Sequence, residues 1–290
     1  MSQLLHKIPI DMFKIGILSL SIKPINIDKF CQKLWSFAKQ AKEADSKLIL
    51  LPEISYTPII TAMNDNILNA TSFLEEEIKK IAKHYSLYIC GGSGLYRINE
   101  KIYNQSFLAT PDGTIIYQTK VNLTESEKRQ GITEGHLIKI LTTPFVKMAI
   151  CICYDIEFPE LVRQMVLEGV DLILIPTHTE TPFGKHRVQF CAQARAIENH
   201  IFIASASLVG KNGPPSRPTG SGRSVLYSPI DSGFTSNGIV AQSRHNQEHL
   251  LFANVDLKQL YELRQNCSTS PLRDYRSFTK RQIQFEYCVI

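Results

Sequence analysis

Between Val146 and Glu160 the chain reads VKMAICICYDIEFPE. Its first eight residues form an almost continuous apolar run, which is typical of a strand that is covered on both faces. Phe158-Pro159-Glu160 then predicts the start of a helix, because proline fits the first helical turn and a carboxylate is favoured there. The stretch therefore predicts a strand followed directly by a helix that ends near Gly169, with Cys153 at the end of the strand.

Strands and helices alternate on both sides of this unit. Each expected strand is a short apolar run bounded by turn residues, and each expected helix places apolar residues on one face. Strands are expected at 13–20, 47–53, 87–91, 170–176, 201–207, 223–227, 237–241 and 249–254, and helices at 27–44, 72–84, 185–199 and from about Asp256. In the middle of the chain, 106–110 and 114–119 flank Pro111-Asp112-Gly113, which indicates a hairpin. This order predicts an α/β fold with mixed sheets.

The chain has the features of one domain. Its 290 residues are 43% hydrophobic and 20% charged, which excludes a disordered or fibrous protein. It contains no internal repeat, and no linker is longer than the Gly/Pro/Ser-rich loop 210–222. We therefore predict a single domain over 1–290, with a core at about 13–276 and a C-terminal tail at 277–290.

Charge and cysteine content restrict the partners and the location. No apolar run is long enough to span a membrane, and the net charge of +5 is scattered rather than gathered into a nucleic-acid groove. The seven cysteines are irregularly spaced in a chain that can fold without disulfides, so we expect reduced thiols and a cytoplasmic location. Cys151 and Cys153 form a C-x-C without a second ligand pair, so no metal site is expected.

Three residues at the ends of apolar strands are candidates for chemistry. The first is Glu53, which directly follows Leu50-Leu51-Pro52 at the end of the strand 47–53. The others are Lys120, which follows the hairpin strand 114–119, and Cys153. Ligand-handling groups collect at strand ends in open α/β sheets, and a helix N-terminus favours a thiolate that faces it. Each residue also has a purely structural interpretation. Glu53 could be a helix cap or an ion-pair partner, Lys120 a surface charge, and Cys153 a buried core thiol.

These residues lie in three segments, LLPE (50–53), YQTKVNLT (117–124) and ICYDIEFPE (152–160). In this order the segments closely resemble the three signatures of the nitrilase or carbon–nitrogen hydrolase superfamily. Downstream, ARAIEN (194–199) and the pattern D-L-x-x-L-x-x-x-R (256–264) resemble two helices of the same family. The resemblance covers almost the whole chain, from about residue 13 to 276.

The resemblance implies a four-layer α-β-β-α sandwich with two mixed sheets, which usually stacks as an eight-layer dimer. It also implies a catalytic set in which Glu53 is the general base, Lys120 stabilises the intermediate and Cys153 is the nucleophile. Glu127 matches a second glutamate of many relatives, and the backbone N–H of Tyr154 would assist Lys120. Neither a metal nor an organic cofactor is required. The expected partners are a small amide and further copies of the chain, with no nucleic acid and no membrane.

Four other residues have simpler expected roles. Asp155 is expected to cap the following helix, Arg195 and Glu198 to form an ion pair, and Cys151 to pack in the core.

Glu157 stands where relatives with the pattern C-Y-D-x-R-F-P-E carry an arginine. At the rim of a pocket it would repel anionic substrates; facing away, it would stabilise the helix N-terminus or pair with an arginine.

The leading functional hypothesis is a cysteine-dependent amidohydrolase. It would cleave a non-peptide C–N bond of a small linear amide through a thioester, releasing ammonia or an amine. One alternative is a nitrilase, although relatives that act on nitriles typically carry Trp-Glu where this chain has Tyr154-Asp155. The other is a catalytically silent binding protein on the same fold, against which the intact set of Glu53, Lys120 and Cys153 argues.

Overall fold

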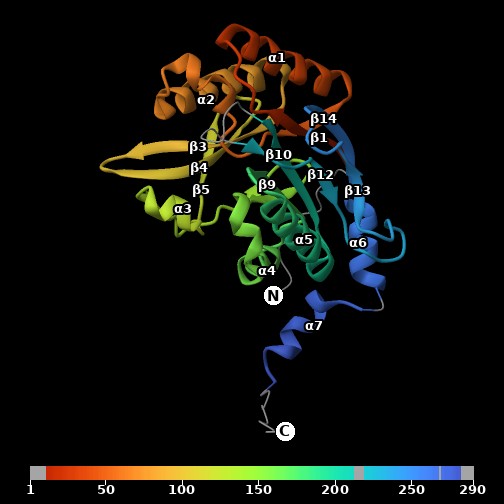
Figure 1. Ribbon diagram of the computed structural model, residues 1–290. Coiled ribbons are helices and arrows are strands. Elements are labelled where there is room, and N and C mark those ends of the chain that lie inside the picture. Colours follow the sequence, from red (N-terminus) through yellow and green to blue (C-terminus); the bar gives the residue numbers. More distant parts are fainter. Residues whose placement is uncertain (1–10, 212–218, 268, 282–290) are drawn as a thin grey trace.

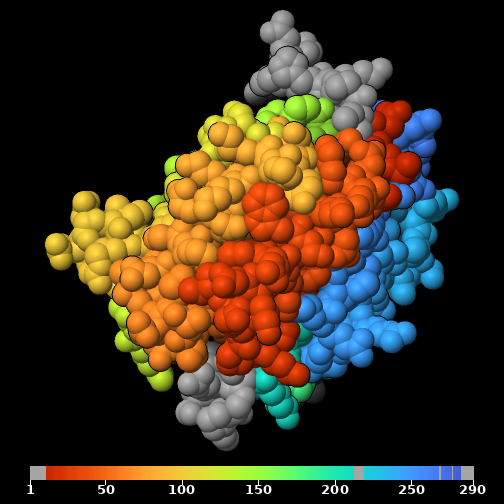
Figure 2. Space-filling model, turned by 90° about the horizontal axis from the view of Figure 1, so that it is seen from above, coloured from red at the N-terminus to blue at the C-terminus, as the bar shows by residue number. Residues whose placement is uncertain are grey.

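Helices enclose two facing layers of strands. The computed structural model describes residues 11–211, 219–267 and 269–281. Helices α1 (Ile27–Glu43) and α2 (Ile67–Tyr85) cover the outer face of one layer, and α4 (Pro159–Leu167) and α5 (Pro182–Asn199) cover the other (Figure 1). Seen from above, the red and orange surface of α1 and α2 hides the strands beneath (Figure 2). The expected α-β-β-α order is confirmed.

The strands of both layers form one continuous hydrogen-bonded path. Among the described residues, the order is β5-β4-β3-β2-β1-β10-β9-β8-β7, and β14 lies off this path, paired antiparallel with β1 over 12–19. The first layer contains β1 (Met12–Ser21), β2 (Ser46–Leu50), β3 (Tyr88–Ile98), β4 (Lys101–Ala109), β5 (Ile115–Thr119), β6 (Ile132–Thr133) and β14 (His249–Asp256). The second contains β7 (Leu141–Thr142), β8 (Lys147–Ile150), β9 (Leu172–Thr177), β10 (Phe202–Lys211), β11 (Thr219–Gly220), β12 (Val225–Tyr227) and β13 (Ile239–Gln242).

A short pairing joins the two layers. β1 and β10 bond in parallel only at Leu20–Leu208 and Ser21–Val209, so the sheet curls over on itself at this point. The remaining helices are α3 (Glu125–Arg129) beside the first layer, and α6 (Leu257–Asn266) and α7 (Pro271–Phe278) at the C-terminal end (Figure 1). In the described part of the chain, no helix is long and apolar enough to cross a membrane.

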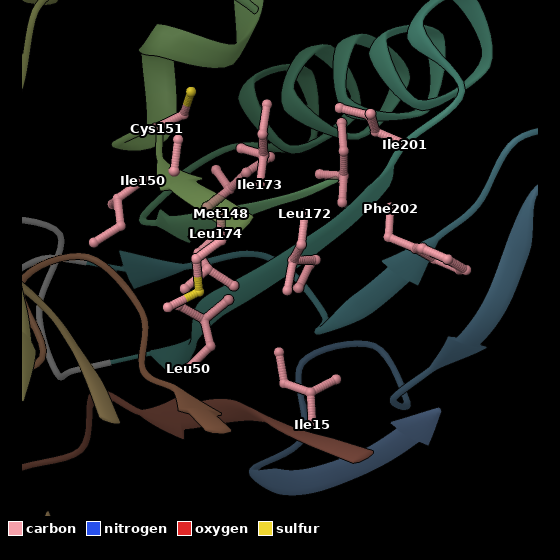
Figure 3. Packing of buried hydrophobic residues seen from close by; sticks show 14 of the residues in the cluster. Ile15, Leu50, Met148, Ile150, Cys151, Leu172, Ile173, Leu174, Ile201 and Phe202 are labelled. Atoms are coloured by element: carbon pink, nitrogen blue, oxygen red, sulfur yellow. The ribbon is translucent and has the colours of Figure 1, made fainter. Parts of the chain in front are cut away.

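The core explains why the strands are apolar on both faces. Successive side chains of a strand point to opposite sides. On β1 and β2, Ile15, Ile17, Leu48 and Leu50 face the second layer, while their neighbours Leu18 and Ile49 pack beneath α1 and α2. Figure 3 shows Ile15 and Leu50 directed toward side chains of the opposite layer, among them Met148, Leu172 and Leu174.

Several expected elements have other bounds in the structure. Helix α2 begins at Ile67 rather than Ser72, because Asn66 caps it by accepting a bond from the Asn69 N–H at 3.0 Å. Strand β8 ends at Ile150, three residues before Cys153. The loop 210–222, the tail 277–290 and the N-terminal segment lie partly outside the described residues, as does Cys288. The six cysteines that the structure describes are free thiols.

Candidate active site

The three candidate residues meet at the floor of one pocket. Lys120 directly follows β5, while Glu53 and Cys153 lie three residues beyond the ends of β2 and β8. The pocket holds about 530 Å³ and contains all three residues in its wall. In the described part of the chain, no group of His, Cys, Asp and Glu side chains is arranged to hold a metal ion.

Lys120 binds two carboxylates at once. Its Nζ lies 2.9 Å from Oε1 of Glu53 and 2.9 Å from Oε1 of Glu127. Burial alone lowers the pKa of an ammonium group, but the charges of Glu53 and Glu127 raise the pKa of Lys120 above its usual value. Lys120 is therefore a permanent cation, although its side chain is only 2% exposed.

Glu127 is held by the cap of a short helix. Its Oε2 accepts bonds from the backbone N–H and hydroxyl of Thr124, at 2.9 and 2.8 Å, in the capping box that begins α3. Burial raises the pKa of a carboxyl group, but Lys120 and the donated hydrogen bonds together lower the pKa of Glu127 below its usual value. The second glutamate thus remains an anion and gives Lys120 a second fixed contact besides Glu53.

Sequence reasoning missed Asn104 and His178, which complete this network. Asn104 Nδ2 donates to Glu53 and Glu127 at 3.1 and 2.9 Å, and its backbone carbonyl accepts the Lys120 N–H at 2.9 Å. The backbone N–H of His178 donates to Oε2 of Glu53 at 3.0 Å. His178 follows the buried strand β9, so the rule that selected Glu53 applied to it as well. Asn104 lies within a strand and carries no such signal.

Cys153 has an unusual backbone conformation. It begins the 3₁₀ turn Cys153–Glu157 with a φ of 48°, in the left-handed region that non-glycine residues rarely adopt. Its Sγ donates to the backbone carbonyl of His178 at 3.5 Å. Strained conformations of this kind are retained where surrounding contacts enforce them, commonly at functional sites. The turn directs the thiol toward the loop after β9 instead of continuing the strand face of Cys151.

The Cys153 thiol is protonated at rest. Burial and then the charge of Glu53 raise its pKa well above the usual value, and Lys120 lowers it by less. The expectation that a helix N-terminus would favour the thiolate is therefore wrong, because α4 begins only at Pro159. A base must remove the proton when the sulfur attacks, and Glu53 is the carboxylate beside it.

This raised pKa predicts the pH dependence of alkylation. In the free protein, the rate of Cys153 modification by iodoacetamide should rise across pH 6 to 9 without a plateau, because only the thiolate reacts rapidly. Site-resolved mass spectrometry of samples quenched at intervals measures this rate separately from the other cysteines. A plateau reached at or below pH 7 would show a thiolate formed in advance.

Asp155 does not cap α4, contrary to expectation. Its Oδ2 accepts the N–H of Ile152 at 3.0 Å, and its Oδ1 accepts the backbone N–H of Asn122 at 2.7 Å. Helix α4 instead follows Phe158 and has no side-chain cap. Asp155 lies too early in the turn to reach the first amides of α4, so it ties the turn of Cys153 to the segment after Lys120.

The other expected positions are also visible. Tyr154 is the second residue of the 3₁₀ turn, where backbone N–H groups have no partner within the turn. Cys151 is buried, with its Sγ 3.8 Å from Sδ of Met165, and Figure 3 shows it directed away from Leu50 and the opposite layer. Arg195 and Glu198 form the expected ion pair at 2.6 Å.

Glu157 lines the pocket but is paired. Both of its carboxylate oxygens accept from Nε of Arg187, each at 3.2 Å. The pair is more exposed than Lys120 and Glu53 and therefore lies nearer to the mouth of the pocket. The wall also includes apolar side chains of Ile54, Leu95, Ile132 and Val188. A site with a thiol, a carboxylate and a fixed cation at its floor has the groups needed for nucleophilic attack on a carbonyl carbon.

Comparison with known proteins identifies similar chains. The family model described as carbon–nitrogen hydrolase matches residues 14–265. The probable hydrolase YhcX of Bacillus subtilis is 33% identical over 275 residues, covering 91% of this chain but 53% of that protein, so the chain spans about half the length of this relative. Omega-amidase NIT2 of Xenopus tropicalis is 25% identical over 285 residues, covering 91% of this chain and 95% of that protein.

Solved structures share the fold. An amidase from Nesterenkonia sp. superimposes with a TM-score of 0.73 at 22% identity, covering 92% of this chain and 94% of that chain. Nit3 of Saccharomyces cerevisiae, a member of the nitrilase superfamily, gives a TM-score of 0.74 at 22% identity, with coverage of 89% and 95%. At this level of identity the likeness concerns the arrangement of helices and strands.

Proposed function

This chain belongs to the carbon–nitrogen hydrolase family, and we propose that it is an amidase that hydrolyses a small linear amide with Cys153 as its nucleophile. The observation that carries the proposal is the contact of Lys120 with both Glu53 and Glu127 at the floor of the pocket that contains the Cys153 thiol. The names of relatives and of solved neighbours, which include omega-amidase and amidase, agree with this activity.

In the first half of the reaction, Glu53 takes the proton of the Cys153 thiol while the sulfur attacks the amide carbon. The carbonyl oxygen becomes an oxyanion, which Lys120 and the backbone N–H of Tyr154 stabilise. Glu53 returns the proton to the nitrogen as the C–N bond breaks. Ammonia or an amine leaves, and the acyl group remains on the sulfur as a thioester.

In the second half, a water molecule takes the place of the amine. Glu53 accepts a proton from this water while its oxygen attacks the thioester carbon, and the same donors stabilise the second oxyanion. Collapse breaks the C–S bond, and the proton on Glu53 returns to the sulfur. The carboxylic acid leaves and the resting thiol is restored, so each step balances with the protein's own groups and water.

The buried hydrogen-bond network fixes the positions of Glu53 and Glu127. Glu53 is held by Lys120, Asn104 and the His178 N–H, so its carboxylate has little freedom to turn away from the thiol. Glu127 supplies a second negative charge to Lys120 and so holds the ammonium group in place beside Glu53. We assign Glu127 the role of a positioning residue, because its oxygens contact Lys120, Asn104 and the cap of α3 rather than the thiol.

Ammonia release from matched amides and nitriles tests the function. We expect the wild-type protein to release ammonia from short primary amides and not from the corresponding nitriles, with one equivalent of acid formed for each ammonia. Turnover of nitriles with little turnover of amides would show a nitrilase instead. No turnover on broad panels of both, by a folded protein, would favour a binding protein on this fold.

A further inference from the structure

The outer part of the pocket carries an excess of negative charge. Below this part, Lys120 is shared between Glu53 and Glu127, which leaves one net negative charge at the floor. Nearer to solvent, Glu157 and Glu180 line the wall together with Arg187, which is the single cation of this part among the described residues. The described residues of the lining therefore include four carboxylates and two cations, a formal charge of −2.

The single cation near the mouth is already occupied. Arg187 donates its Nε to both oxygens of Glu157, whose side chain is 15% exposed against 62% for Arg187. A substrate carboxylate would have to compete with this partly buried partner for the guanidinium group. Glu180 is exposed, and no cation of the described residues lies within 4 Å of its carboxylate. Within 11–211, 219–267 and 269–281, the wall therefore offers a carboxylate without an ion-pair partner, Glu180, but no cation without one.

Both rim carboxylates are close to the reacting groups along the chain. Glu157 ends the 3₁₀ turn that Cys153 begins. Glu180 follows His178 by two residues, and His178 contacts both the Cys153 thiol and the Glu53 carboxylate through its backbone. The charges therefore belong to the pocket that contains the sulfur, where the free end of a bound substrate can meet them.

Apolar side chains contribute to the same wall. Side chains of Ile54, Leu95, Ile132 and Val188 line it, and they suit methylene groups rather than further polar groups. Fields are concentrated in a cleft with low-dielectric walls, so the excess negative charge acts on a bound molecule more strongly than it would on an open surface.

We propose that this site selects its substrate by charge, accepting a short amide that carries an ammonium group beyond a methylene spacer and rejecting amides that end in a carboxylate. Glu180 receives the ammonium group, and the Glu157–Arg187 pair keeps the rim closed to anions. This inference rests on the proposed amidase activity and adds the substrate class to it.

Three primary amides of equal length, ending in an ammonium, a methyl and a carboxylate group, test the inference. The wild-type kcat/KM should be highest for the cationic amide, and at least about tenfold higher than for the anionic one. Glu180→Gln should reduce this cationic-to-anionic ratio severalfold. Raising the salt concentration should narrow it too, since salt screens charges near the surface.

The ion pair provides two variants with opposite expected effects. Glu157→Gln releases Arg187 and should lower the cationic-to-anionic ratio by roughly tenfold, whereas Arg187→Gln leaves Glu157 unpaired and should raise the ratio. Glu262→Gln is the matched control, because Glu262 is exposed on α6, outside the pocket wall, and loses the same charge. Its ratio should equal that of the wild-type protein.

The neutral amide separates failure of the inference from failure of the proposed function. If none of the three amides is hydrolysed, the amidase proposal is wrong and charge selection falls with it. If the neutral amide is hydrolysed but the wild-type protein prefers the anionic one, charge selection is wrong while the amidase remains. Equal ratios for the wild-type protein, Glu157→Gln and Arg187→Gln would overturn charge selection in the same way.

Discussion

Cys153→Ala is expected to lower the rate of amide hydrolysis by about 10³-fold or more, because alanine has no atom that can form the thioester. The fold should remain, since the change removes one buried sulfur from a turn that is held independently by Asp155, whose carboxylate accepts the N–H groups of Ile152 and Asn122. Ammonia release by the purified variant measures the loss, and its thermal unfolding curve shows whether the protein is intact.

Cys151→Ala is the matched control for this experiment. Cys151 lies two residues away and is equally buried, but its sulfur packs against Met165 rather than in the pocket. We expect it to keep most of the wild-type kcat, with a loss of stability on the order of 1 kcal/mol from the small cavity. Loss of turnover in Cys151→Ala together with normal turnover in Cys153→Ala would reverse the assignment of the nucleophile.

The sequence predicted the features that depend on residues close to one another along the chain. The alternation of apolar runs with amphipathic segments predicted most of the helices and strands, because residues covered on both faces must be apolar. Glu53, Lys120 and Cys153 were found because each stands at the end of an apolar run, and the family signatures then suggested their roles. The structure adds that Glu127, which the same resemblance suggested, contacts Lys120 directly.

The remaining features depend on contacts between distant segments. Asn104 is separated from Glu53 by 51 residues, and Glu157 from Arg187 by 30, so neither partner can be identified from local pattern. The left-handed conformation of Cys153 is likewise imposed by its surroundings, since nothing in the sequence of this turn requires a positive φ. Asp155 was misassigned because its partner Asn122 comes from another segment.

Lys120→Met is expected to lower kcat by a factor on the order of 10² to 10³, with a smaller change in KM, because Lys120 acts on charge that develops only during the reaction. This single change has a second effect, since it leaves Glu53 and Glu127 buried together without their cation. Breaking a buried ion pair costs about 3 to 5 kcal/mol, and one of the two carboxyl groups would then take up a proton.

The double variant Lys120→Met/Glu127→Gln separates the two effects. Removing the second carboxylate relieves the repulsion between the two glutamates, so the thermal stability should recover toward the wild-type value. If Lys120 stabilises the oxyanion, kcat nevertheless stays about 10²-fold or more below the wild-type value. In Glu127→Gln alone, where Lys120 is intact, kcat should fall far less. Near-normal kcat in the double variant would mean that Lys120 serves only to balance the charges of the two glutamates, and that the oxyanion depends on the backbone N–H of Tyr154 alone.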